Sequence, residues 1–185
     1  GDSDEIKLGN FIGDFVKGHD WQAYPPAVQQ GILLHRTIDS YTDNHAMTDR
    51  SVARIRPYAG RYSPPFTDIL YDYLLALNWD KYTDEPFEDF AAKTYRQLEN
   101  RRAEMPAILQ ERLPKMTAGK FLHGYTRRDG LEWVLDRFSL RLAGNFDAKA
   151  LGHFFFEEIE AFSEDFNAFF PDLLRISKEK VRLLP

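Results

Sequence analysis

His35 and Asp39 are the residues of this sequence whose types and spacing most clearly suggest chemistry. They lie four positions apart within segment 31–44, so a helix would place them on one face with their Cβ atoms about 6 Å apart. Val28 and Ile32 share that helical stripe, which is apolar and should face inward. Burying an imidazole and a carboxylate without partners is costly, so another side chain, a water molecule or a metal ion must meet them.

Three further aspartates lie at the margins of apolar faces on other predicted helices. Hard divalent cations bind several carboxylate and imidazole ligands from separate elements, and the pKa of water on such a cation can fall to about 7. One interpretation is therefore a metal site built from Asp14, His35, Asp39, Asp68 and Asp72. The alternative is a histidine hydrogen-bonded to its own carboxylate, with aspartates that are solvated or begin a helix.

Length and composition indicate one domain that includes residues 1–185. The chain is 43% hydrophobic, which is enough to bury a core. It has no cysteine, so there is no disulfide framework and a metal would be held by histidine and carboxylates. Such ligands suit Mg, Mn, Fe or Zn.

Charge and hydropathy argue against two classes of partner. The net charge of -5 disfavours a nucleic-acid binder, whose footprint is usually basic. No apolar run approaches the length needed to span a bilayer, and no signal peptide opens the chain. We therefore expect no nucleic-acid partner, no membrane partner and a cytoplasmic location, while the oligomeric state stays open.

The apolar periodicity favours an all-α fold, a single-domain helical bundle. Gly9 and Gly13 would weaken the first helix, which suggests a side where another backbone approaches closely. Three prolines, Pro57, Pro114 and Pro171, are expected to end, kink or divide helices. The predicted helices are 3–17, 27–44, 48–56, 66–79, 83–105, 115–127, 130–142 and 148–180.

Three segments together resemble the acyl carrier protein phosphodiesterase family. They read GNFIGDFVKG at 9–18, YPPAVQQGILLHRTIDSYTDN at 24–44 and FTDILYDYLLALNW at 66–79. Their order and spacing match that family, and the pattern at 166–174 resembles its C-terminal helix. The resemblance covers nearly the whole chain.

This resemblance implies an all-helical fold related to HD-type phosphohydrolases and a divalent-metal hydrolase, with Mn or Mg as the usual ion. The implied reaction releases 4′-phosphopantetheine from the serine of holo-acyl carrier protein. Family members open with a short histidine-bearing segment, which would lie before Gly1 and supply a further ligand; the sequence leaves open whether it is truncated or absent. The positions that match the family's motif residues are Asp14, His35, Asp39, Asp68 and Asp72.

Within this interpretation Asp39 and Arg36 are the expected catalytic residues. Arg36 or a further carboxylate would stabilise charge or protonate the leaving serine oxygen. Two alternatives remain: a phosphohydrolase acting on a nucleotide or other small phosphodiester, and a non-catalytic helical module that binds carrier proteins. Because acyl carrier proteins are acidic, we expect basic residues to form a docking surface, with Arg36, Arg54, Arg56 and Arg61 as its first candidates.

Overall fold

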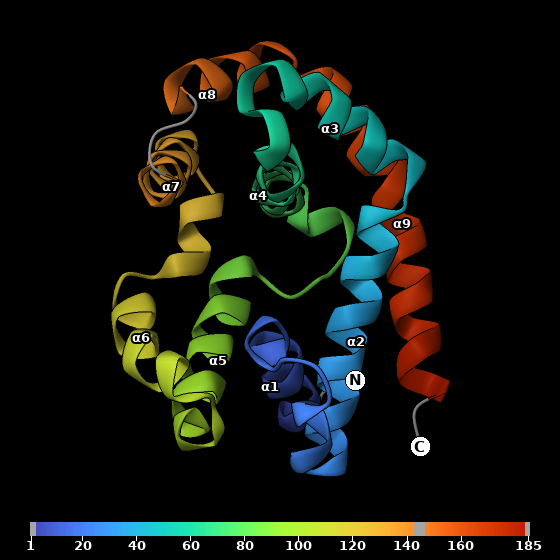
Figure 1. Ribbon diagram of the computed structural model, residues 1–185, viewed down its shortest axis with the longest axis vertical. Helices are drawn as coiled ribbons and strands as arrows, with labels where there is room; N and C mark the ends of the chain where they lie inside the picture. Colours follow the sequence, from blue (N-terminus) through green and yellow to red (C-terminus); the bar gives the residue numbers. More distant parts are fainter. Residues whose placement is uncertain (1–2, 143–146, 184–185) are drawn as a thin grey trace. The chain divides into compact units, whose positions relative to one another are not determined.

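The computed structural model describes residues 3–142 and 147–183, and within these ranges the chain forms α-helices, short 3-10 turns and no strand (Figure 1). The all-α prediction is confirmed. None of the described helices is long and apolar enough to cross a membrane. The helices are α1 (Asp4–Ile12), α2 (Pro26–Asp43), α3 (Ala46–Ala59), α4 (Ser63–Leu77), α5 (Phe87–Asn100), α6 (Ala107–Ala118), α7 (Arg128–Arg141), α8 (Ala148–Glu157) and α9 (Ile159–Leu183).

The chain divides into two compact units, each of which is described by itself. Unit 1 comprises Gly1–Thr42, Phe90–Gly119 and Pro171–Pro185. Unit 2 comprises Asp43–Asp89 and Lys120–Phe170. The boundaries therefore fall inside α5 and α9, before the last residue of α2, and between α6 and the 3-10 turn that follows it. That the whole chain acts as one domain stays a prediction.

In unit 1, helices α1 and α2 touch through their backbones. A Cβ atom on Gly9 would overlap the carbonyl oxygen of Val28 and lie 2.8 Å from Cα of Gly31. A Cβ atom on Gly31 would overlap the carbonyl oxygen of Ile6. The close backbone approach predicted from Gly9 is confirmed, and it lets the two helices cross at a distance that larger residues would prevent.

The start of α1 also follows from its sequence. Ser3 is the N-cap, and its side chain accepts a hydrogen bond from the backbone N–H of Ile6 at 3.5 Å. Asp4 and Glu5 occupy the first turn, where carboxylates complement the helix dipole. Gly18 follows in a left-handed conformation with a φ of +49°, which favours glycine and turns the chain away from the helix.

In unit 2, the core is largely aromatic. Helices α3, α4, α7 and α8 contact one another, together with the first part of α9. Phe166 lies edge-on to Tyr71 of α4, with ring centroids 5.4 Å apart. The phenylalanines from α4, α8 and α9 that are almost completely buried are Phe66, Phe155, Phe162 and Phe166.

The predictions that proline ends or divides a helix were wrong at three helices, while a kink at Pro171 stays a prediction. Pro57 lies inside α3, Pro114 inside α6 and Pro171 inside α9, and the predicted helix 115–127 is replaced by α6 and a 3-10 turn. A proline inside a helix removes one backbone hydrogen bond and costs about 3 kcal/mol. Burial of neighbouring apolar residues offsets this cost, as with Leu109 and Leu113, which are fully buried just before Pro114.

Candidate metal centre

Three of the five predicted ligand residues come together in unit 1. Helix α1 ends at Ile12 and continues as a 3-10 turn, Gly13–Phe15, which carries Asp14. His35 and Asp39 lie one turn apart on α2. Nε2 of His35 is 3.2 Å from Oδ1 of Asp14 and 3.1 Å from Oδ2 of Asp39. One nitrogen of the imidazole therefore contacts two carboxylates that come from different elements.

Gly13 determines how closely Asp14 approaches α2. A Cβ atom at this position would lie 2.7 Å from Cβ of His35 and would overlap two ring carbons. Gly13 is buried, and four residues earlier Gly9 makes the backbone contact described above. Gly9 of α1 and Gly13 of the 3-10 turn that follows thus face Gly31 and His35, which are one turn apart on α2.

The electrostatics of the cluster favour a positive charge at its centre. The pKa of the His35 imidazole is raised above its ordinary value, first by the hydrogen bond to Asp39. Partial burial opposes this rise, and the charge of Asp39 and the hydrogen bond and charge of Asp14 add to it. A proton and a metal ion would compete for Nε2, so a cation should bind this site more tightly as the pH increases.

The donor set also fits a divalent cation in its geometry. One ligand atom from each of Asp14, His35 and Asp39 lies within 4.8 Å of the other two. Neighbouring ligands of an octahedral ion with bonds of about 2.1 Å are about 3 Å apart. Both measured imidazole–carboxylate distances are close to that value. A nitrogen with two carboxylate oxygens suits Mn, Mg, Fe or Zn.

Arg36 lies beside this cluster but makes a different kind of contact. Its Nη2 donates hydrogen bonds to the carbonyl oxygens of Val16 at 2.9 Å and Gly18 at 3.0 Å. The guanidinium therefore holds the loop that follows Asp14 against α2. The catalytic role expected for Arg36 stays a prediction, and the contacts support a role in positioning Asp14.

Asp68 and Asp72 lie in unit 2, one turn apart on α4, and both are exposed. Although Asp72 keeps accessible surface, surrounding protein atoms desolvate it and raise the pKa of its carboxyl group to about 7, and the charge of Asp68 adds to this rise. Each carboxylate would be stabilised by a cation. Their use together with Asp14, His35 and Asp39 stays a prediction.

A buried ion network in unit 2 was not expected from the sequence. Asp165 of α9 is fully buried, forms an ion pair with Arg54 of α3 and accepts a hydrogen bond from Ser51 at 3.1 Å. Arg54 is thus committed to an internal contact, which argues against its expected role in docking, whereas Arg56 and Arg61 are exposed. The sequence carries no signal for this pairing because the two partners lie far apart along the chain.

The all-α fold and an imidazole in contact with two carboxylates define a helical protein with a candidate divalent-metal centre. Comparison with known proteins narrows this class. The family model described as acyl carrier protein phosphodiesterase matches residues 1–173, so the chain belongs to this family, as the resemblance predicted. The relation to HD-type phosphohydrolases stays a prediction.

Similar proteins carry the same name. An acyl carrier protein phosphodiesterase of Enterobacter sp. (strain 638) is 29% identical over 140 residues, which cover 75% of this chain and 72% of that protein. One of Yersinia pestis is 26% identical over 185 residues, which cover 96% of this chain and 93% of that protein. No solved structure was found to match the chain.

Proposed function

We propose that this chain is a metal-dependent phosphodiesterase that releases 4′-phosphopantetheine from the serine of holo-acyl carrier protein. The observation that carries the proposal is the cluster of Asp14, His35 and Asp39 in a chain of this family. The names of the relatives supply the substrate, and the cluster supplies a place for the ion that such a hydrolysis uses. Mn and Mg are the proposed ions.

The reaction adds water across one phosphorus–oxygen bond. The hydroxyl group of the water joins phosphorus, the bond to the serine oxygen breaks, and that oxygen takes up a proton. A divalent ion, when bound, polarises the phosphodiester and lowers the pKa of water. The protein must therefore fix a cation next to the phosphorus and keep it there during substrate binding.

Each residue of the cluster has a specific task in this proposal. Neutral His35 presents Nε2, and the carboxylates of Asp14 and Asp39 neutralise the charge of the ion. Arg36 keeps Asp14 in reach by its two hydrogen bonds to the following loop. Asp39 meets the same Nε2 as Asp14, and it is partly exposed and so within reach of substrate; it is the proposed catalytic carboxylate.

Mass spectrometry of holo-acyl carrier protein tests the proposal. The carrier protein is incubated with the purified chain and Mn or Mg, and the loss of the phosphopantetheine mass is the expected result. Asp39→Ala should lower kcat/KM at least about 100-fold, since even partners of metal ligands are worth 10- to 100-fold in affinity. Asp20→Ala, which removes an exposed aspartate outside the cluster, should leave it unchanged.

The same assay distinguishes the two alternatives. Turnover of a nucleotide or small phosphodiester, with intact holo-acyl carrier protein, would replace the proposal by a small-molecule phosphohydrolase. Binding of the carrier protein without any change of mass would replace it by a non-catalytic binding module. Full activity and full metal content in a folded Asp39→Ala protein would refute the site.

A further inference from the structure

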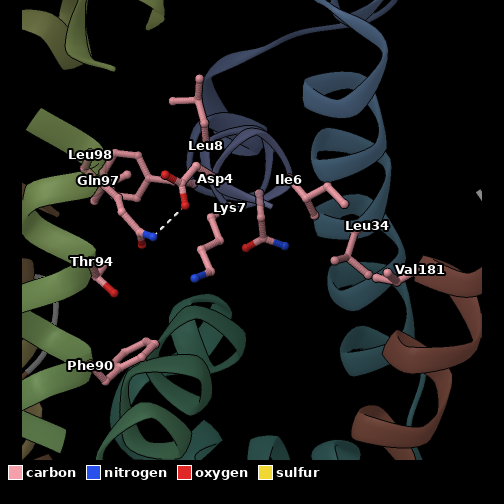
Figure 2. A pocket seen from close by; sticks show the side chains of 12 residues that line it. Asp4, Ile6, Lys7, Leu8, Leu34, Phe90, Thr94, Gln97, Leu98 and Val181 are labelled. Carbon is pink, nitrogen blue, oxygen red and sulfur yellow. Dashed lines mark hydrogen bonds between the residues drawn. The ribbon is translucent and has the colours of Figure 1, made fainter. Parts of the chain in front are cut away.

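Unit 1, which carries the candidate metal centre, also contains a pocket of about 300 Å³. Helices α1, α2, α5 and the last part of α9 line it, and Figure 2 shows their side chains around it. Its volume is at the lower end of the range of about 300 to 1,000 Å³ that is usual for small-molecule pockets. No residue of this pocket takes part in the metal cluster.

The pocket has apolar walls with a few polar groups. Phe90 of α5 and Leu34 of α2 are among the apolar side chains, and Thr94 and Gln97 add a hydroxyl and an amide group (Figure 2). Asn10 adds a second amide, and Asp4 and Lys7 add one charge of each sign. Such a lining fits a ligand that is neither a plain hydrocarbon nor highly charged. A chain that alternates methyl or methylene groups with amides meets both parts of this surface.

Gln97 shows which kind of polar group the pocket lacks. Its Nε2 donates a hydrogen bond to Oδ1 of Asp4 at 2.6 Å. Because a carboxylate only accepts, this contact fixes which end of the amide is oxygen. That oxygen, Oε1, is buried and has no hydrogen-bond partner among the described residues. An N–H group of a ligand would satisfy it and remove the cost of an unpaired buried acceptor.

The pocket and the metal cluster both use α2, and the 3-10 turn that carries Asp14 continues directly from α1. Asn10 of the pocket lining precedes Asp14 of the cluster by four residues, about one helical turn. Asp4, at the other end of the lining on α1, lies ten residues before Asp14, or roughly 15 Å along the helix. The arm from phosphorus to sulfur of phosphopantetheine has about 13 bonds, as long as about four extended residues or roughly 15 Å.

We propose that this pocket binds the pantetheine arm of the substrate. The inference rests on the proposed function, because it places the phosphodiester at the cluster of Asp14, His35 and Asp39. The geminal methyl groups of the arm contact the apolar walls, and one of its amide N–H groups donates to Oε1 of Gln97. The cluster thus selects the phosphate while the pocket selects what is attached to it.

Binding of pantetheine alone, measured by titration calorimetry, tests the pocket without requiring turnover. Thr94→Phe places a ring in the cavity and should weaken the binding of pantetheine at least about tenfold, and it should raise KM for holo-acyl carrier protein. Ala92→Phe puts the same ring on an exposed position of α5 and should change neither quantity. Gln97→Leu removes the unpaired acceptor and should weaken pantetheine binding several-fold even if Thr94→Phe fails to fold.

Unchanged pantetheine binding in both pocket variants would overturn the inference. So would an effect confined to acylated carrier protein, because the pocket would then hold the acyl chain instead of the arm. Failure of the proposed function gives a different pattern: the wild-type protein would leave holo-acyl carrier protein intact while pantetheine still binds and Thr94→Phe still weakens it.

Discussion

Replacing Gly13 by alanine should damage the candidate metal centre without removing any ligand. The added Cβ would lie 2.7 Å from Cβ of His35 and closer still to two ring carbons, whereas ordinary contacts begin at 3.4 Å. The imidazole must therefore retreat by about 1 Å, which exceeds the tolerance of about 0.2 Å for metal–ligand distances. A disturbed ligand orientation typically costs 10- to 100-fold in metal affinity, and we expect a loss of about that size.

Two opposing effects decide the stability of the Gly13→Ala protein. Alanine is preferred over glycine in a helix by up to about 1 kcal/mol. Overpacking of a well-filled site costs about 1 to 3 kcal/mol. Because the overlap involves ring atoms of a half-buried side chain, we expect the second effect to prevail and the protein to lose about 1 kcal/mol while staying folded.

Calorimetric titration with Mn²⁺, together with circular dichroism and urea unfolding, measures both effects. Gly152→Ala is the matched control: a Cβ at this position of α8 would lie 3.5 Å from Leu135, an ordinary contact. The control should keep the Mn²⁺ affinity and gain a little stability. An unchanged Mn²⁺ affinity in folded Gly13→Ala protein would refute the assignment of His35 as a ligand held by this packing.

Three further predictions concern pH, the buried ion network and docking. The hydrogen bond from Arg101 is the main reason that the pKa of Glu5 is lowered to about 2, so this pair stabilises the fold above about pH 4.5 and loses its effect as the pH falls toward 2. Glu5→Gln should flatten the pH dependence of the urea midpoint in that range. Parallel curves for the wild-type and variant proteins would contradict this prediction. Asp165→Asn removes the buried carboxylate that pairs with Arg54 and, at 3.3 Å, with the more exposed Arg50, and it should cost about 3 kcal/mol in urea unfolding. The change Glu164→Gln at the exposed neighbouring position should cost almost nothing. Arg56→Glu should raise KM for holo-acyl carrier protein, and added salt should raise the KM of the wild-type protein. The reason is that exposed positive charges steer an acidic partner and that salt screens them. A KM that responds to neither change would favour docking through apolar contacts.

The helices near the candidate site were predictable because their signals are local. Ser3 and the acidic first turn mark the start of α1, and the predicted helix 27–44 differs from α2 by one residue at each end. The predicted end of the first helix at residue 17 was wrong, because α1 ends at Ile12 and a 3-10 turn follows. Pro171 shows the opposite case. The chain passes through it as part of α9, because the helix is anchored by buried Phe169 and Leu173 on either side, and such long-range packing leaves no trace in the local pattern.

The site was predictable to the extent that it depends on spacing along one helix. His35 and Asp39 share a face of α2 whatever else the chain does. Asp14 could be placed near them only through the glycines of α1, and the crossing of α1 and α2 confirms that indication. The pocket beside the site could not be predicted, because Gln97 reaches it only through the packing of α5 against helices distant in sequence.

The same geometry explains why Arg36 does not share the environment of its neighbour. Successive residues on a helix point about 100° apart, so a side chain directly after His35 leaves the face that carries the cluster. The guanidinium instead meets the carbonyl oxygens of Val16 and Gly18, where the chain leaves Asp14. In the proposed metal centre a further positive charge beside the ion would repel it, whereas in its observed place the arginine holds the loop that follows Asp14. His35 is thus the proposed ligand, and Arg36 is the residue that positions Asp14.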